Sequence, residues 1–270
     1  VVGPHLAEDD REMGAYDVVN LDPYVGPDFL EVPPVAWVPW RDKALHDWLL
    51  GKKFVSQVAR ALMRYPYPRP RMSDAERRAE LKVFMGKAEV QWLKSTGPVR
   101  GERLYKYPIG NEMLRQDGRG VRLANSFFTE AILSVKHRHY FNIVDGWENY
   151  GAVKSALRAI INLKYDSLDM AHMVRGFAVK HYVAVNFRPM AAWAMYDRFC
   201  PRGGTILDPS AGFGARLLGA WKSTAARYIG VDPSSAVKSG FDEEVTWLRR
   251  NSRQTEAELI NLPAEDVDYG

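Results

Sequence analysis

The chain has 270 residues, a net charge of +4, and 46% apolar and 26% charged side chains, which are ordinary values for globular proteins. Wholesale disorder is therefore excluded, and the length allows one large domain with an attached module or two smaller domains. The sequence contains no apolar run near the roughly 20 residues that a membrane helix needs and no signal-peptide pattern at its start. We therefore expect an intracellular protein without membrane contacts.

The first 40 residues form an acidic stretch that is rich in proline. They carry eight acidic side chains against one arginine, a net charge of −7, and prolines at 4, 23, 27, 33, 34 and 39. Because proline interrupts helices, we expect an arm made of loops with at most one strand. Within it, an apolar run at 16–21 leads into Asp22-Pro23-Tyr24, for which an ordinary turn after an edge strand is the simplest interpretation.

Residues 41–122 form a basic block, with 19 Lys and Arg against 9 Asp and Glu, a net charge of +10. Such a density suits a polyanion, because each phosphate that a basic side chain neutralises releases bound counterions. Tyr65 and Tyr67 alternate with prolines and with Arg64, Arg69 and Arg71, and such rings and guanidinium groups stack on bases. The block favours nucleic acid as a partner, with a solvated helical surface or a stiff linker as the alternatives.

Helical periodicity dominates the middle of the chain. Apolar residues at helical spacing predict two short helices or one kinked helix over 44–63, interrupted near Gly51. Ser73 and Glu76 form a capping box that opens a helix ending at about Met85. After turn-rich stretches at 95–102 and 115–120, further helices are expected from about 124 to 141, over 152–163 and over 169–177.

Histidine and cysteine usage gives little support for a metal site. His137 and His139 stand close together in a Lys-His-Arg-His-Tyr-Phe run, which we interpret as the basic end of a helix rather than as metal ligands. Cys200 is the only cysteine, so the chain forms no internal disulfide and a zinc ion would lack a second thiolate ligand. We expect no bound metal.

Beyond Tyr182 the pattern changes to alternating strands and helices. A helix over 191–199 and a turn precede an apolar strand at 205–208, and a helix over 215–221 leads to a second strand at 227–232. This β-α-β order is typical of a parallel sheet covered by helices, so we expect an α/β fold. We divide the chain into an N-terminal arm with a basic, mostly helical region at 1–122, a helical region at 123–185 and a ligand-binding half at 186–270.

The turn after the first of these strands holds the residues of most chemical interest. Gly212 and Gly214 allow a tight turn and close approach of a ligand, and Asp232 ends the next strand 24 residues after Asp208. An acid at about that offset binds ribose hydroxyls in nucleotide-binding units. A dehydrogenase is the main competitor, but Leu217 stands where its fingerprint has a third glycine, and Asp208 suits a cationic ligand better than a pyrophosphate.

The run from Asp208 to Gly214, Asp-Pro-Ser-Ala-Gly-Phe-Gly, resembles motif I of the DNA amino-methyltransferases, which methylate adenine N6 or cytosine N4. The longer stretch from Met173 to Trp221 is similar to a group of bacterial and phage DNA methylases. The resemblance runs from about Asn125 to Asp266, slightly over half of the chain. It implies a Rossmann-like methyltransferase sheet, S-adenosylmethionine as the cofactor, double-stranded DNA with a flipped target base as the substrate, and a bacterial or phage-infected cytoplasm.

The same resemblance implies roles for particular residues. An Asn-Phe-x-Pro element precedes motif I in the family and helps to hold the methionine end of the cofactor; here it matches Asn186, Phe187 and Pro189. Asp232 corresponds to the acid that binds the ribose. The full set of implied cofactor contacts is Phe187, Pro189, Asp208, Pro209, Ala211, Gly212, Gly214, Asp232, Glu265 and Asp266, the last two near the adenine ring.

The family's motif IV, Asp/Asn/Ser-Pro-Pro-aromatic, binds the target amino group and stacks on the flipped base. The motif does not occur after Asp266, and the most similar run in the chain, Asp22-Pro23-Tyr24, lacks one proline. Either the catalytic motif lies beyond Gly270, which we favour, or the motifs are permuted and Asp22, Pro23 and Tyr24 are the catalytic candidates. Cys200 precedes a proline instead of following one, which disfavours cytosine C5 chemistry.

We therefore expect S-adenosylmethionine-dependent methylation of an exocyclic amine of DNA. The alternatives are a catalytically incomplete methyltransferase-like module that binds DNA, and an RNA methyltransferase. The sequence indicates neither the target base nor the oligomeric state.

Overall fold

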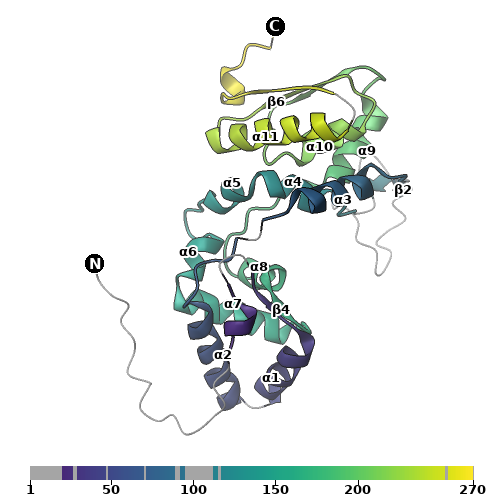
Figure 1. The fold of residues 1–270 in the computed structure, drawn as a ribbon. Helices are drawn as coiled ribbons and strands as arrows, with labels where there is room; N and C mark the ends of the chain where they lie inside the picture. The colour runs from purple at the N-terminus through teal and green to yellow at the C-terminus, as the bar shows by residue number, and fades with distance from the viewer. Residues whose placement is uncertain are drawn as a thin grey trace. The chain divides into compact units, whose positions relative to one another are not determined.

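A computed structural model of the protein describes residues 20–26, 29–46, 48–69, 71–88, 92–94, 112–114, 117–252 and 255–269 (Figure 1). The chain divides into two compact units that alternate along the sequence. Unit 1 comprises residues 1–69 and 139–183, and unit 2 comprises residues 70–138 and 184–270. The ranges 1–122, 123–185 and 186–270 taken from the sequence are consecutive, whereas each of these units is assembled from two separate segments.

Unit 1 is mainly helical in its described part. Its helices are α1 (Pro34–His46), α2 (Trp48–Leu62), α6 (Ile143–Trp147), α7 (Tyr150–Asn162) and α8 (Met170–Ala178). The short strands β1 (Glu31–Val32) and β4 (Leu168–Asp169) pair antiparallel, and a 3-10 turn, η1 (Asp22–Tyr24), precedes them. The helices predicted over 152–163 and 169–177 are confirmed. The pattern over 44–63 does form two helices, but the interruption predicted near Gly51 was wrong, because α1 ends at His46 and Gly51 lies inside α2, where the helix tolerates a glycine.

Helix α1 contradicts the expectation that prolines keep residues 1–40 free of helix. Pro34 is its first residue, where no backbone N–H is needed, and only Pro39 lies in the interior. Trp37 is fully buried, and its indole Nε1 donates to the carbonyl of Tyr165 at 3.0 Å. This packing outweighs the one hydrogen bond that Pro39 removes. The described part of the same stretch holds the short strand β1, which is consistent with the expectation of at most one strand there.

Unit 2 contains the parallel sheet. The strands β5 (Thr205–Asp208), β6 (Arg227–Val231) and β7 (Glu256–Ile260) lie in that order and run parallel. They alternate with α10 (Ala215–Lys222) and α11 (Ser235–Asn251), while α9 (Pro189–Phe199) precedes β5 and the 3-10 turn η2 (Ala264–Asp266) follows β7. The predicted strands at 205–208 and 227–232 and the mixed α/β class are confirmed.

The described part of unit 2 also holds α3 (Asp74–Met85), α4 (Val121–Phe127), α5 (Thr129–Ser134) and the antiparallel pair β2 (Trp92–Lys94) and β3 (Glu112–Leu114). Helix α3 begins with the predicted capping box: the Ser73 hydroxyl accepts from the Glu76 N–H at 3.3 Å, and the Glu76 carboxylate accepts from the Ser73 N–H at 2.8 Å. The turn-rich stretch at 95–102 lies outside the described residues.

The helix predicted from 124 to 141 is only partly confirmed, because α5 ends at Ser134. The following run that contains His137 and His139 is exposed and not helical, so the interpretation as a basic helix end was wrong. A short helix is stable in a protein only when it packs an apolar face against the core, and every side chain of residues 136–140 is exposed. None of the helices in the described ranges has both the length and the apolarity to cross a membrane.

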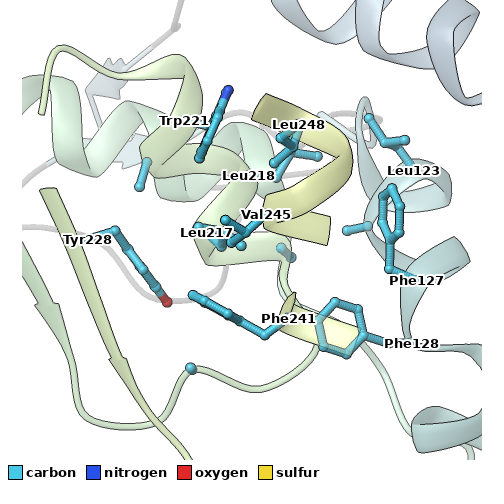
Figure 2. Packing of buried hydrophobic residues seen from close by; sticks show 14 of the residues in the cluster. Leu123, Phe127, Phe128, Leu217, Leu218, Trp221, Tyr228, Phe241, Val245 and Leu248 are labelled. Carbon is cyan, nitrogen blue, oxygen red and sulfur yellow. The ribbon is translucent and has the colours of Figure 1, made fainter. Parts of the chain in front are cut away.

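The core of unit 2 lies on one face of the sheet. Figure 2 shows buried side chains from β6, α4, α10 and α11 gathered in one cluster, with Tyr228 on the sheet side and Trp221 and Leu248 from the helices. Along β5, Ile206 is buried in this cluster while Leu207, on the other face, is 50% exposed. Both crossover helices lie on the same face of the sheet (Figure 1), as successive right-handed crossovers in one direction require.

Candidate functional site

The carboxyl ends of the three parallel strands meet at one edge of the sheet in unit 2. Asp208 ends β5, Asp232 directly follows β6 and Asn261 directly follows β7. Backbone hydrogen bonds connect these ends. The Ala211 N–H donates to the carbonyl of Val231, the last residue of β6, at 2.9 Å, and the Asp232 N–H donates to the carbonyl of Ile260, the last residue of β7, at 3.1 Å. Polar side chains therefore collect where open α/β sheets bind their ligands.

Residues 209–214, which we call the glycine turn, connect β5 to α10. Gly212 and Gly214 have φ of 61° and 75°, in the left-handed region that favours glycine. A Cβ on Gly214 would overlap the Glu244 carboxyl and the Phe128 ring, so packing inside the protein requires glycine there. A Cβ on Gly212 would meet nothing closer than Arg216 at 3.7 Å. The protein itself thus leaves space beside Gly212, which a ligand can fill.

The Asp232 carboxylate faces this turn. It accepts hydrogen bonds from the backbone N–H of Gly212 and of Ser234, each at 3.0 Å, and its residue remains partly exposed. The Asn261 side chain holds the same strand end by donating to the Asp232 carbonyl at 2.8 Å. Two sequence-predicted contacts, Gly212 and Asp232, are therefore neighbours at one edge of the sheet.

The Asp208 carboxylate is less available than the sequence suggested, because protein donors already engage it. It is buried and accepts from the Ser210 N–H at 3.2 Å, from Arg216 Nε at 2.6 Å and from the Tyr228 hydroxyl at 2.6 Å. Burial, and then the charge of Asp208, raise the pKa of Tyr228 well above its usual range, so its hydroxyl keeps the proton that it donates. Burial lowers the pKa of Arg216, but the hydrogen bond and charge of Asp208 outweigh this and raise it overall.

Replacing Tyr228 with phenylalanine removes one donor to this buried carboxylate and keeps the ring that packs in the core. We expect the free energy of unfolding to fall by about 1.5–3 kcal/mol, the range for hydrogen bonds to charged groups, in urea denaturation followed by circular dichroism. The control is Tyr269→Phe, whose exposed hydroxyl donates to the Ala264 carbonyl at 3.0 Å. Its loss should stay near roughly 0.5 kcal/mol, as at other surface positions. Equal losses in the two variants would contradict the assigned role of Tyr228.

The Asn-Phe-x-Pro element lies against the glycine turn. The Asn186 side chain donates to the Phe213 carbonyl at 2.7 Å and to Asn125 Oδ1 at 2.9 Å. The Phe187 ring lies under the Arg216 guanidinium, 5.5 Å from ring centre to carbon. Pro189, buried, is the first residue of α9. These residues thus hold one side of the turn, and two residues far away in the sequence, 125 and 186, meet there.

The remaining predicted cofactor contacts differ in exposure. Pro209 is exposed at the start of the glycine turn, and Ala211 is buried within it. Glu265 and Asp266 are exposed in η2, just beyond the carboxyl end of β7. With Asp232, they place carboxylates after the second and third strands.

The catalytic candidates Asp22, Pro23 and Tyr24 belong to unit 1, whereas Asp208 and Asp232 belong to unit 2. They form η1, a 3-10 turn, and the Asp22 carboxylate accepts from the Tyr65 hydroxyl at 2.6 Å. The apolar residues expected to form a strand before them, 16–19, lie outside the described residues.

Both tyrosines of the basic and aromatic segment around residue 67 contact other residues of unit 1. The Tyr67 ring packs edge-on against Trp147 with centroids 5.6 Å apart, and burial raises the pKa of Tyr67 to about 12. Tyr65 donates to Asp22 through its hydroxyl. The arginines of the segment are exposed instead; they are Arg64, Arg69 and Arg71.

Sequence reasoning missed Arg216, Tyr228 and Asn125 as partners of the glycine turn. Arg216 stands two residues after Gly214, and its position in the first turn of α10 was the one signal that placed it near Asp208. Tyr228 and Asn125 reach the turn through tertiary packing, for which the sequence offers no local pattern. Among the described residues, no group of three or more His, Cys, Asp or Glu side chains is arranged to hold a metal ion.

Comparison of the chain with protein families, with curated proteins and with solved structures found no match.

Proposed function

We propose that the protein is a methyltransferase that uses S-adenosylmethionine to methylate an exocyclic amine of DNA, at adenine N6 or cytosine N4. The observation that carries the proposal is the pairing of Asp232 with Gly212 at the carboxyl edge of a parallel sheet. A partly exposed carboxylate beside an open glycine turn offers the acceptor that a ribose needs and the space that a nucleoside needs.

The residues at this edge fit the charge of such a donor. Its ammonium and sulfonium groups are cationic, and the carboxylates of Asp232, Glu265 and Asp266 stand after β6 and β7. Asp208 is neutralised by Arg216, so its part is to hold the glycine turn and not to attract the ligand directly. We assign the ribose hydroxyls to Asp232 and the adenine edge to Glu265 and Asp266.

The protein's contribution to the reaction is positioning. A bound sulfonium supplies its own activated methyl group, so transfer requires an amine held in line with the carbon and sulfur. The glycine turn fixes the donor, and Asn186 fixes the turn through the Phe213 carbonyl. A pair of fixed partners reacts faster because the entropy of bringing them together has already been lost on binding.

DNA as the substrate is supported by charge. The basic block at 41–122 has a net charge of +10, and its described arginines at 64, 69 and 71 are exposed. Because counterion release drives such binding, we expect the logarithm of the DNA association constant to fall linearly with the logarithm of the salt concentration.

The proposal is tested by two assays on the same preparation. Calorimetric titration with S-adenosylmethionine measures binding of the donor, and a separate titration with oxidised nicotinamide adenine dinucleotide tests the dehydrogenase alternative. Transfer of a labelled methyl group to unmethylated duplex DNA, followed by digestion to nucleosides, then identifies the modified base. We expect donor binding, no nicotinamide binding, and label in N6-methyladenine or N4-methylcytosine.

Each other outcome selects one alternative. Donor binding without transfer would favour a module that binds DNA but lacks the catalytic motif. Greater transfer to single-stranded RNA would indicate an RNA methyltransferase, and nicotinamide binding would indicate a dehydrogenase. Absence of donor binding at every protein concentration that calorimetry allows would contradict the proposal as a whole.

A further inference from the structure

The side chain of Glu244, on α11, is a buried carboxylic acid. Its exposed fraction is 0%, and neither carboxyl oxygen has a hydrogen-bond partner within the described part of the chain. Buried acids are normally paired, because an unpaired ionised carboxylate in an apolar environment is strongly unfavourable. A buried acid without a partner therefore needs a physical explanation.

The carboxyl group of Glu244 lies directly beneath the glycine turn. A Cβ on Gly214 would overlap Oε2 of Glu244 and come within 3.0 Å of its carboxyl carbon. The same Cβ would overlap the Phe128 ring, which Figure 2 shows beside Phe241 at the edge of the core. Glu244 and Phe128 together fill the space that a side chain at position 214 would occupy, and so they support the turn from below.

The charged groups that act on Glu244 come from two helices. Arg77 of α3 favours the ionised form. Its two terminal nitrogens donate to Glu243 and to the Ser126 carbonyl, each at 2.9 Å, and the guanidinium lies over the Phe127 ring, while its Nε is buried without a hydrogen-bond partner among the described residues. Glu243, the neighbour on α11, disfavours the ionised form through its own charge. The contacts from the glycine turn and from the α4–α5 junction, Gly214 and Phe128, are uncharged.

Burial decides the balance between these groups. It raises the pKa of Glu244 well above its ordinary value of 4.5. The positive charge of Arg77 lowers this pKa but is outweighed, and the negative charge of Glu243 raises it further. Ionisation would place a negative charge beside Gly214, the N-cap of α10, where the free amides of that helix are donors. No hydrogen bond between them exists in the structure, so forming one requires the turn to move.

We propose that Glu244 is a positioning residue for the glycine turn: as a neutral carboxyl it holds the turn in the form that binds the methyl donor, and its ionisation displaces the turn. The link to the donor rests on the proposed function. The protonation state and its effect on the turn do not, since both are properties of the free protein.

The first measurement compares the stability of wild type, Glu244→Gln and Glu243→Gln between pH 4 and pH 9 by urea denaturation. A folded-state pKa above the unfolded value of 4.5 gives stability that is complete below that value and is lost as the pH rises to the folded pKa. The unfolding equilibrium constant of wild type should rise about tenfold per pH unit relative to Glu244→Gln over this window. Glu243→Gln retains Glu244, and the side chain of Glu243 is 54% exposed, so wild type should show no such slope relative to Glu243→Gln.

The second measurement follows the turn itself. Amide hydrogen exchange of a peptide covering the glycine turn is compared in wild type and Glu244→Gln at the same pH values, and donor affinity is measured by calorimetry in the same buffers. Above the folded pKa we expect faster exchange and at least tenfold weaker donor binding in wild type only. Below it the two proteins should agree.

The outcomes separate this inference from the proposed function. Parallel stability profiles for wild type and Glu244→Gln would overturn the neutral state of Glu244. Diverging stability with identical exchange would overturn its positioning role, whether or not the donor binds. Diverging stability and exchange without donor binding in any protein would uphold the effect on the turn and contradict the methyl-donor assignment.

Discussion

Replacing Gly214 with alanine is expected to lower the free energy of unfolding by about 3 kcal/mol, because two separate penalties add at this position. The left-handed backbone alone costs about 1 kcal/mol for a residue with a side chain. The new methyl group also overlaps Glu244 and Phe128 in a filled core, and overpacking of this kind costs roughly 1–3 kcal/mol more. Urea denaturation followed by circular dichroism measures the loss.

The chain provides a matched control for this prediction. Gly203 has a φ of 74°, almost the same as the 75° of Gly214, but a Cβ there would meet no atom within 4 Å. Gly203→Ala should therefore lose only the backbone part, about 1 kcal/mol. Similar losses at the two positions would mean that the space beneath the glycine turn is not filled as described, and the support from Glu244 would then be in doubt as well.

Replacing Asp232 with asparagine is expected to weaken the binding of S-adenosylmethionine roughly 100-fold, which corresponds to losing one or two hydrogen bonds to a charged acceptor. The amide can still accept from one of the two backbone donors, Gly212 and Ser234, so the strand end should keep its shape. The affinity is measured by calorimetry, and circular dichroism checks that the fold is retained.

The control for Asp232 is Asp242→Asn on α11. Asp242 also lies in unit 2 and is ion-paired with Lys238 one helical turn away, on the exposed side of the helix. The substitution changes the net charge by the same amount, so a general electrostatic effect would appear in both variants. Equal donor affinity for Asp232→Asn and wild type would show that the ribose is bound elsewhere.

Much of the sheet in unit 2 could be predicted from the sequence, because its signals are local. The apolar strand at 205–208, the two glycines after it and the second strand at 227–232 each follow from neighbouring residues. The same holds for α3, where Ser73 and Glu76 form the capping box through side chains three residues apart. Local hydrogen bonds of this kind depend little on the rest of the fold.

The parts that could not be predicted depend on packing between distant residues. Helix α1 forms despite Pro39 because Trp37 is buried against Tyr165, which lies more than a hundred residues away. The Asp208 carboxylate was expected to contact a cationic ligand, and its hydrogen bond with the Tyr228 hydroxyl follows only from the pairing of β5 with β6. Burial and charge neutralisation of this kind have no periodic signature in a sequence.

The division into two units was hidden for a related reason. Unit 2 joins residues 70–138 to residues 184–270, and α3 and α4 contribute Phe84 and Leu123 to the core that α10 and α11 share. Helical periodicity predicts where a helix forms, but it does not indicate against which hydrophobic core that helix packs. The basic block at 41–122, taken as one region, therefore contributes to both units.

The central claim is that the glycine turn of unit 2 binds a methyl donor, and an amide spectrum of protein labelled with ¹⁵N at its 21 glycines tests it most directly. On titration with S-adenosylmethionine, we predict saturable shifts of the Gly212 and Gly214 resonances, assigned by single substitutions. The glycines of unit 1 at 51, 146, 151 and 176 should keep their positions. Unchanged Gly212 and Gly214 resonances at saturating donor, or shifts confined to unit 1, would contradict the account.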